Sequence, residues 1–376
     1  MTIFNRSIEP HIKKLLFKKR AILIFGPRQA GKTTLAKKLI KEFRDEGAYF
    51  NCEELSVRHH FSLGEPGKMK ELVGDKKIVV FDEAQTIQNI GAILKVFIDA
   101  YPNVQIIATG SSSFDLANKI NEPLTGRSFE FILYPLSLEE IRKSGITLDE
   151  KELHKLLRLG SYPAIVGEPN GNIRENLLKN ITTNYLYKDI FVFESIKNPK
   201  VFEDLIKLLA YQIGSLVSVN ELSRELGVSR NTVDKYIRLL EQAYIIKRLH
   251  SFSRNRRNEI KKAFKIYFID TGIRNVAADL LDADISKRDD KGALFENFFF
   301  SEKLKEYALE TFPPTLAFWR TAQKQEVDFV EQKGNELKAY ECKWNSTDFS
   351  FKPFLEKYPE ATTELITSKD LIASDT

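Results

Sequence analysis

The sequence has few cysteines, no long apolar run and no strong excess of charge of either sign. Only Cys52 and Cys342 occur among the 376 residues, which argues against a disulfide framework or a multi-cysteine zinc site and favours a reducing compartment. No apolar run approaches the roughly 20 residues that span a bilayer or the roughly seven of a signal-peptide core, so we expect a cytoplasmic protein without a membrane partner. The 57 Lys and Arg against 52 Asp and Glu give a formal charge of +5, which excludes an acidic tail and a basic coat.

The remaining composition predicts a folded α/β protein of two or three domains. Apolar residues make up 43% of the chain, enough to bury real cores. Short apolar runs at 21–25, 48–51, 77–81, 104–109 and 128–133 alternate with helical stretches, which is typical of a parallel sheet covered by helices. Along the chain we predict four regions, namely a parallel-sheet core over 1–135, a helical lid over 136–212, a helix-turn-helix region over 213–286 and a further α/β unit over 287–376, with a polar linker at 287–292.

A phosphate-binding loop follows the first apolar run. Residues 26–34 read GPRQAGKTT and match G-x-x-x-x-G-K-[ST] between a strand and a helix. The two glycines let backbone N–H groups face a phosphate, the Lys32 ammonium neutralises β/γ charge, and the Thr33 hydroxyl binds Mg²⁺. The alternative is a glycine-rich turn that binds no nucleotide. The predicted nucleotide-binding residues here are Gly26, Pro27, Arg28, Gln29, Ala30, Gly31, Lys32, Thr33 and Thr34.

Two carboxylates end the third apolar run, at the edge where open α/β sheets bind ligands. We expect Asp82 to hold Mg²⁺ and Glu83 to act as general base on the attacking water. The alternative is that this pair only caps the next helix. The neighbouring run ends in Gly-Ser-Ser-Ser, where Ser111 could sense the γ-phosphate, although a plain serine-rich turn is the other interpretation.

Residues 216–250 have the layout of a winged helix-turn-helix, with helices at 220–226 and 230–243 around a turn at 227–229. Val233, Ile237 and Leu240 mark the buried face of the second helix. A basic stretch over 247–265 follows, with eight Lys or Arg against the single Glu259, and it suits a nucleic-acid backbone. Alternatively, the region packs as a regulatory lever and its charges are only solvated. The candidate DNA contacts are Arg230, Asn231, Lys235, Arg238, Arg254, Arg256 and Arg257.

The last part of the chain carries the pattern of PD-(D/E)XK nucleases. Asp328 lies on one predicted strand, and Glu341 and Lys343 follow on the next. Asp328 and Glu341 could share a divalent metal, Lys343 could hold water or phosphate charge, and Glu296 resembles the helical carboxylate of that fold. Glu326 shares a strand face with Asp328. The alternative is a chance pairing of Glu and Lys on a strand face, and the pattern leaves cleavage itself open.

The motifs GPRQAGKTT, VVFDEAQ, ATGSSS, LTGR and YPLSLEE, in this order, resemble predicted AAA+-type ATPases of bacteria and archaea, related to STAND ATPases, that carry a C-terminal nuclease-like domain. The resemblance covers essentially the whole chain and implies an ATP-driven switch or motor, with ATP and Mg²⁺ as cofactors. It makes Arg127 a candidate arginine finger or γ-phosphate sensor, with a structural salt bridge as the alternative. It also puts Gly160 and Pro163 in a lid near the nucleotide, with Arg158 as a guess for a second sensing arginine.

These observations favour Mg²⁺-dependent ATP hydrolysis coupled to binding or remodelling of duplex or branched DNA, with a possible metal-dependent nuclease domain, by a homo-oligomer that could form a ring. Two alternatives stay open. One is a non-nucleolytic, ATP-controlled signalling switch whose C-terminal domain binds protein. The other is a motor on branched DNA that uses the nuclease-like fold only for gripping.

Overall fold

The chain forms two compact units. The computed structural model describes residues 3–110, 124–183, 196, 198–253, 264–346 and 348–373. We call Thr2–Leu136 together with Gln242–Tyr244 the phosphate-loop unit, and Ser137–Glu241 together with Ile245–Thr376 the C-terminal unit. Within the described ranges, no helix is both long and apolar enough to cross a membrane.

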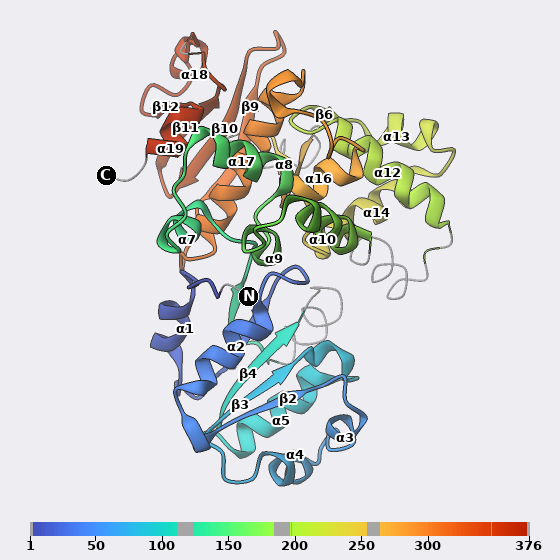
Figure 1. Ribbon diagram of the computed structural model, residues 1–376, viewed down its shortest axis with the longest axis vertical. Coiled ribbons are helices and arrows are strands. Elements are labelled where there is room, and N and C mark those ends of the chain that lie inside the picture. The colour runs from blue at the N-terminus through green and yellow to red at the C-terminus, as the bar shows by residue number, and fades with distance from the viewer. Residues whose placement is uncertain are drawn as a thin grey trace. The chain divides into compact units, whose positions relative to one another are not determined.

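The phosphate-loop unit is built on a five-stranded parallel sheet in the order β2-β3-β4-β1-β5. All five strands lie where the apolar runs predict them, within one residue at each end. Figure 1 shows α2 across one face of this sheet and α5 across the other. The elements are α1 (Glu9–Leu15), β1 (Ala21–Phe25), α2 (Lys32–Lys41), η1 (Arg44–Glu46), β2 (Gly47–Asn51), α3 (Leu55–Arg58), α4 (Pro66–Val73), β3 (Ile78–Asp82), η2 (Ala84–Thr86), α5 (Ile90–Ala100), β4 (Gln105–Gly110) and β5 (Ser128–Ile132).

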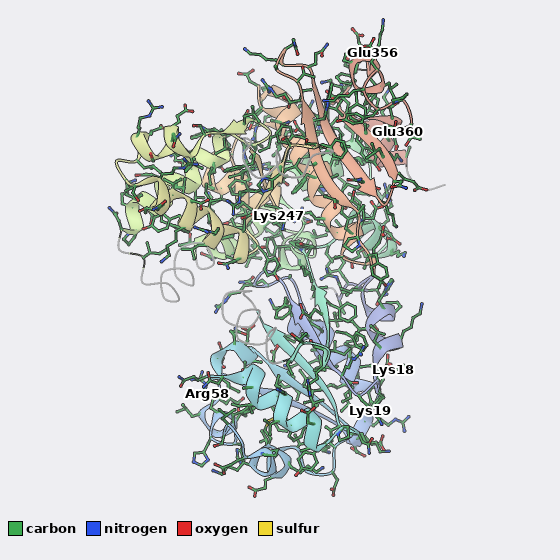
Figure 2. The ribbon with its side chains drawn as sticks, turned by 180° about the vertical axis from the view of Figure 1, so that it is seen from behind. Lys18, Lys19, Arg58, Lys247, Glu356 and Glu360 are labelled. Atoms are coloured by element: carbon green, nitrogen blue, oxygen red, sulfur yellow. The ribbon has the colours of Figure 1, made fainter. Side chains whose placement is uncertain are left out.

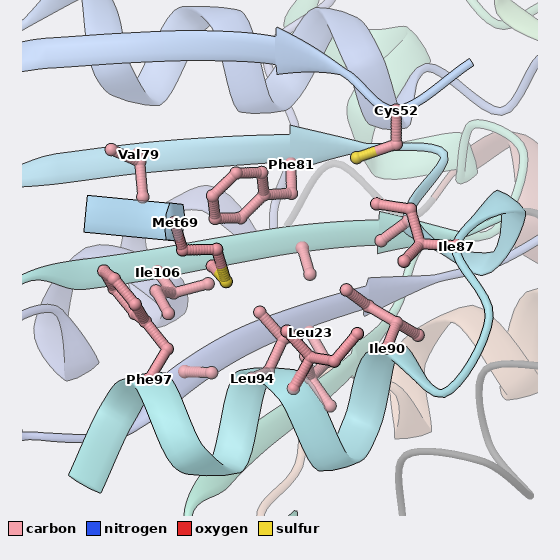
Figure 3. Close-up of a cluster of buried hydrophobic side chains, with 14 of the residues drawn as sticks. Leu23, Cys52, Met69, Val79, Phe81, Ile87, Ile90, Leu94, Phe97 and Ile106 are labelled. Carbon is pink, nitrogen blue, oxygen red and sulfur yellow. The ribbon is translucent and has the colours of Figure 1, made fainter. Parts of the chain in front are cut away.

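The central strands of this sheet are buried on both faces, which is why they read as continuous apolar runs. Every residue of β1, β3 and β4 is buried. On one face, Leu94 and Phe97 of α5 pack with Met69 of α4 against Leu23 and Phe81 of the sheet (Figure 3). This rigid core holds the carboxyl ends of β1, β3 and β4, and with them the loops that follow.

The C-terminal unit combines helices with two sheets. One sheet is three-stranded, in the order β6-β8-β7, and the other is four-stranded, in the order β12-β11-β10-β9. The predicted strands that carry Asp328 and Glu341 are β10 and β11, whereas the edge strand β12 is not predicted. The elements are α7 (Leu138–Lys143), α8 (Glu150–Leu159), α9 (Pro163–Val166), α10 (Gly171–Thr183), α12 (Pro199–Tyr211), β6 (Leu216–Val217), α13 (Val219–Glu225), α14 (Arg230–Gln242), β7 (Ile246–His250), β8 (Phe264–Phe268), α16 (Thr271–Ala277), η4 (Ile285–Lys287), α17 (Lys291–Tyr307), β9 (Thr315–Arg320), β10 (Glu326–Lys333), β11 (Glu336–Cys342), α18 (Lys352–Leu355), β12 (Thr362–Ile366) and α19 (Ser368–Ala373).

The two sheets of the C-terminal unit share one core. Leu249 of β7 and Tyr267 of β8 belong to the same buried cluster as Phe295 and Phe300 of α17 and Phe329 of β10. Because its phenylalanines point in several directions, α17 is apolar over much of its circumference, and it is buried between these elements. Strands β7 and β8 therefore form one packed body with the last sheet.

The segment predicted as a linker, 287–292, carries buried ion pairs. The Asp290 carboxylate lies 2.5 Å from Nη1 of Arg274, whose side chain is 1% exposed, and 2.7 Å from Nη2 of Arg288. The segment also contains the end of η4 and the start of α17. Part of the polar, charged composition of this segment therefore serves internal pairing.

The segment expected to act as a lid near the nucleotide is part of the C-terminal unit's core. Gly160 follows α8 with φ +75°, and a Cβ atom there would lie 2.0 Å from Oδ1 of Asp270. The Asp270 carboxylate accepts hydrogen bonds from the backbone N–H groups of Ser161, at 2.8 Å, and of Gly272, at 2.9 Å. Arg158 pairs with Glu175 and donates to the carbonyl of Leu281 at 2.7 Å. These groups join α8 to α16 within the C-terminal unit.

Candidate functional site

The phosphate loop joins β1 to α2 in a backbone conformation that requires glycine. Gly26 has φ +142°, and a Cβ atom there would lie 2.2 Å from the carbonyl oxygen of Leu133. Gly31 precedes α2 with φ +98°. Both positions would be strained by a side chain. Of the other predicted loop residues, Pro27 and Ala30 are buried, Arg28 is half-buried, and Gln29 and Thr34 are exposed.

Lys32 is a buried cation at the start of α2. Its ammonium donates to the backbone carbonyls of Gly26, at 2.9 Å, and Pro27, at 2.8 Å. Burial lowers the pKa of Lys32 to about 8, although Glu83 and Asp82 act in the opposite direction. A partly charged carbonyl is a weaker partner for an ammonium than an anion is. Lys32 is therefore suited to receive a phosphate.

Three hydroxyl groups converge on the Asp82 carboxylate at the end of β3. Oδ2 accepts from Thr33 of α2 at 2.7 Å and from Tyr49 of β2 at 2.6 Å, and Oδ1 accepts from Thr109 of β4. Asp82 is buried, and it caps no helix. The sequence predicts that Thr33 and Asp82 act together, but it does not single out Tyr49 or Thr109. A hydroxyl and a carboxylate are hard oxygen ligands, so the pair fits Mg²⁺.

Glu83 is held beside Asp82 in a strained backbone conformation. Its φ is +53°, which is uncommon for a residue with a side chain. Its N–H donates to the Thr109 hydroxyl at 3.1 Å, and its carboxylate accepts from the Gln85 amide at 2.5 Å. Both groups orient a half-buried carboxylate at the edge of the sheet that carries the phosphate loop. Ser111, the predicted sensor, lies outside the described residues.

Arg127 lies at the opposite edge of the sheet from the phosphate loop. Its carbonyl accepts from the N–H of Ala21, the first residue of β1, whereas Gly26 follows the last residue of that strand. Five strand residues separate the two edges by about 16 Å. The Arg127 side chain pairs with Asp99 at 2.8 Å. The structure therefore favours the salt-bridge interpretation, and Arg127 is not placed to sense a γ-phosphate in its own chain.

Arg6 supports the loop from the N-terminal segment, and sequence reasoning missed it. This buried guanidinium donates to the carbonyl of Ala30 at 2.6 Å and to the carbonyl of Tyr134 at 2.6 Å. It thus ties the phosphate loop to the chain that follows β5. No motif marks such a residue, because its partners are backbone atoms far away in the sequence.

A second polar site lies in the C-terminal unit, where the predicted nuclease-like residues come together. Asp328 accepts from the N–H of Cys342 at 3.0 Å, and its own N–H donates to Glu341 at 3.3 Å. Lys343 pairs with Glu341 at 2.7 Å. The pairing of β9 with β10 shifts register between Val327 and Val330, so an irregularity brackets Asp328.

Lys265 of β8 also enters this group, and sequence reasoning placed it in the basic stretch instead. Its side chain is 1% exposed, and its ammonium lies 2.6 Å from Glu326, 3.1 Å from Glu296 and 3.9 Å from Asp328. Tyr267, two residues on along β8, donates its hydroxyl to Glu296. We call Glu296, Glu326, Asp328 and Glu341 with Lys265 the carboxylate cluster.

The pKa values within the carboxylate cluster reflect burial and charge crowding. Burial raises the pKa of Asp328 well above its usual range, and the nearby carboxylates of Glu296 and Glu341 raise it further. Burial also raises the pKa of Glu341, against the effect of Lys343. Burial alone would lower the pKa of Lys265, but its carboxylate neighbours raise it by more.

The carboxylate cluster does not fit a resident divalent metal. Across the described part of the chain, no three His, Cys, Asp or Glu side chains are arranged to hold a metal ion. One oxygen each of Glu296 and Glu326 already faces the Lys265 ammonium, and one oxygen each of Asp328 and Glu341 accepts a backbone N–H group. The predicted metal site at Glu296, Asp328 and Glu341 is therefore not the arrangement that the structure contains.

The helix-turn-helix has the predicted buried and exposed faces. Val233, Ile237 and Leu240 of α14 are buried. The predicted DNA contacts Arg230, Asn231, Lys235 and Arg238 are exposed, and Arg238 pairs with Asp234 at 2.9 Å. The predicted contacts Arg254, Arg256 and Arg257 lie outside the described residues.

The basic stretch is less uniform than its composition suggests. Lys247, labelled in Figure 2, is exposed. Arg248 pairs with Asp234 at 3.0 Å and Glu241 at 2.7 Å, and Lys265 is buried. Two of the eight cations are therefore occupied within the protein, which corrects their assignment to a nucleic-acid surface.

Family models divide the chain into three matched parts. Residues 18–142 match the model of the AAA domain. Residues 150–284 and 291–372 match two models described as domains of unknown function, DUF8612 and DUF4143. With its phosphate loop and parallel sheet, the first part is an AAA-type P-loop domain.

The similar proteins carry no functional description. An uncharacterized protein of Methanocaldococcus jannaschii is 27% identical, with 87% of this chain and 75% of that protein covered. An uncharacterized protein of Mycobacterium tuberculosis is 28% identical, with 92% of this chain and 75% of that protein covered. Among solved structures, the RuvB Holliday junction branch migration motor of Thermotoga maritima covers 65% of this chain and 90% of its own, at 17% identity and a TM-score of 0.36. That likeness is too low to carry an argument about function.

Proposed function

We propose that the chain binds Mg²⁺–ATP at the phosphate loop and hydrolyses it. The observation that carries the proposal is the 2.7 Å hydrogen bond between Thr33 and Asp82, which joins the first turn of α2 to the carboxyl end of β3. Magnesium bound there would neutralise charge on the β- and γ-phosphates. The Lys32 ammonium would leave its carbonyl partners for the phosphates, and the glycine-lined loop would supply backbone N–H groups.

Glu83 is the proposed general base. Its carboxylate lies next to Asp82 and is oriented by Gln85, so it can take a proton from a water that attacks the γ-phosphate. In the Glu83→Gln variant, we expect ATP to bind with near wild-type affinity and hydrolysis to fall at least about 100-fold. Binding of a fluorescent ATP analogue and phosphate release measure the two effects. Exposed Glu71 of α4 provides the matched control, Glu71→Gln, and normal turnover by Glu83→Gln would refute the assignment.

We further propose that the winged helix-turn-helix binds DNA and that ATP controls this contact. The supporting observation is that Arg230, Asn231 and Lys235 are exposed on α14, whose opposite face is buried. If phosphates are bound, affinity for duplex DNA falls steeply with salt, because counterions are released. Arg230→Ala combined with Lys235→Ala should weaken binding and flatten that salt dependence. Binding unaffected by salt, or no binding at all, would favour the signalling-switch alternative.

Two alternatives remain for the C-terminal unit, a DNA-binding part of a motor and a nuclease, and assays with different DNA substrates distinguish them. We propose that the C-terminal sheet binds DNA without cutting it, since the Lys265 ammonium already occupies the carboxylate cluster. ATPase stimulation by single-stranded, duplex and four-way-junction DNA would identify a motor on branched DNA. Cleavage that requires Mn²⁺ and disappears in Asp328→Asn would show a nuclease instead.

A further inference from the structure

The Lys265 side chain is the most deeply buried member of the carboxylate cluster. It extends from β8 to Glu296 on α17 and to Glu326 and Asp328 on β10. Its ammonium also lies 5.6 Å from the centre of the Phe318 ring. A lysine whose side chain is 1% exposed needs negative partners, since an unpaired buried charge is costly. The position is thus specific for a cation.

We infer that Lys265 is the resident cation of the carboxylate cluster and keeps a divalent metal out of it. Its distances of 2.6 Å and 3.1 Å to Glu326 and Glu296 place the ammonium where the carboxylates of α17 and β10 converge. Mg²⁺ needs oxygens at about 2.1 Å in a nearly octahedral set. The ammonium and the metal ion therefore compete for the same oxygens, and only one of them fits.

Several other oxygens of the cluster are also occupied. One oxygen of Asp328 accepts from the backbone N–H of Cys342 at 3.0 Å. The two oxygens of Glu341 accept from Lys343, at 2.7 Å, and from the backbone N–H of Asp328, at 3.3 Å. Glu326 also pairs with Arg320. Four carboxylates thus face three side-chain cations, which leaves at most one negative charge for an added ion.

Removal of the Lys265 charge should turn the cluster into a metal site. Lys265→Met keeps a long apolar side chain but frees the oxygens of Glu296, Glu326 and Asp328. We expect this variant to bind Mn²⁺ at least about tenfold more tightly than the wild type, because a like charge within 4 Å is removed. Adding Asp328→Asn to Lys265→Met should abolish the gain.

The experiment is a titration of the full-length protein with Mn²⁺ and no nucleotide, in which the electron paramagnetic resonance signal of free Mn²⁺ is measured. The wild type and Asp328→Asn should give the same curve, and Lys265→Met should bind additional Mn²⁺ that Lys265→Met/Asp328→Asn does not bind. Wild-type binding that Asp328→Asn removes would overturn the inference. So would a folded Lys265→Met variant that binds no more Mn²⁺ than the wild type.

If Lys265→Met does not fold, the comparison of Mn²⁺ binding by the wild type and Asp328→Asn still tests the inference. Trp319 and Trp344, the only two tryptophans in the chain, both lie in the C-terminal unit, so their fluorescence reports whether this unit is folded. With an unfolded variant, identical curves for the wild type and Asp328→Asn support the inference, and different curves refute it. Because no ATP is present, the result is independent of hydrolysis at the phosphate loop.

Discussion

The phosphate loop and the carboxylate cluster each place a buried lysine near carboxylates, yet the two lysines have opposite environments. Lys32 donates to two backbone carbonyls, and burial lowers its pKa to about 8. Lys265 contacts carboxylates directly, and they raise its pKa despite burial. Both side chains are almost inaccessible to water.

The difference shows that residue types alone do not define a ligand site. Among its described contacts, Lys32 lacks a direct anionic partner, so an arriving phosphate supplies the charge that the buried ammonium needs. Lys265 already has its anions, so the carboxylate cluster gains little from another cation. Lys32 is therefore available to bind a ligand anion, whereas Lys265 already occupies the carboxylate cluster.

The largest expected effect comes from removing the lysine that lacks an anion. Lys32→Ala should lower ATP hydrolysis at least about 100-fold, because a positioned charge on the transferring phosphate is lost. The protein should stay folded, since Lys32 forms no ion pair with the described residues. Steady-state phosphate release measures the loss. Lys41→Ala, at the exposed end of the same helix, is the control and should retain wild-type turnover.

Removing the paired lysine should instead destabilise the protein. Lys265→Met leaves Glu296 and Glu326 without their buried partner, which costs about 3 kcal/mol of unfolding free energy. Urea denaturation followed by tryptophan fluorescence reports on the C-terminal unit. Lys338→Met, which breaks an exposed pair with Glu364 on the four-stranded sheet, should cost less than about 1 kcal/mol. An equal loss of unfolding free energy in Lys265→Met and Lys338→Met would contradict the structural role given to Lys265.

The lowered pKa of Lys32 predicts that ATP binding weakens in alkali. ATP favours the charged ammonium, which the free protein loses above about pH 8, so affinity should fall by up to about tenfold per pH unit above that value. Without nucleotide, the contribution of Lys32 to folding stability has the opposite pH dependence to ATP affinity. The unfolded chain holds the proton up to about pH 10.4, so the contribution of Lys32 to stability rises between about pH 8 and 10.4. Fluorescent-nucleotide titrations from pH 7 to 9.5 measure the affinity, and Lys32→Arg should show no such decline, because a guanidinium stays charged.

The smallest expected effect concerns the hydroxyl that Tyr49 donates to Asp82 at 2.6 Å. Tyr49→Phe should change the Mg²⁺ concentration for half-maximal ATPase activity by about fivefold, the size of one hydrogen bond, and leave folding intact. Tyr101→Phe in the same unit is the matched control. A loss as large as that of Lys32→Ala would mean that Tyr49 does more than orient Asp82.

The sequence predicts most of the fold because its signals are local. Strands β1 and β3 are buried on both faces and read as apolar runs, and Lys32, Thr33 and Asp82 follow a motif whose spacing sets their geometry. Lys265 and Arg6 escaped prediction for a common reason. Their partners lie at least 24 residues away, and tertiary packing alone brings them together.

Composition is a poor guide to charged segments whose side chains form ion pairs within the protein. The segment 287–292 looks like a linker, but Asp290 holds two arginines. The stretch 247–265 looks uniformly basic, but Arg248 and Lys265 have carboxylate partners in the fold. A charged residue in a sequence can face water, a ligand or another residue, and only the tertiary structure distinguishes these cases.

The most direct test of the account is a crystal structure of the full-length protein with Mn²⁺ and a non-hydrolysable ATP analogue, in which anomalous scattering locates the metal. We predict one manganese peak beside Thr33 and Asp82, with Lys265 still contacting Glu296 and Glu326. A manganese ion bound by Glu296, Asp328 and Glu341, or no metal and nucleotide at the phosphate loop, would contradict the account.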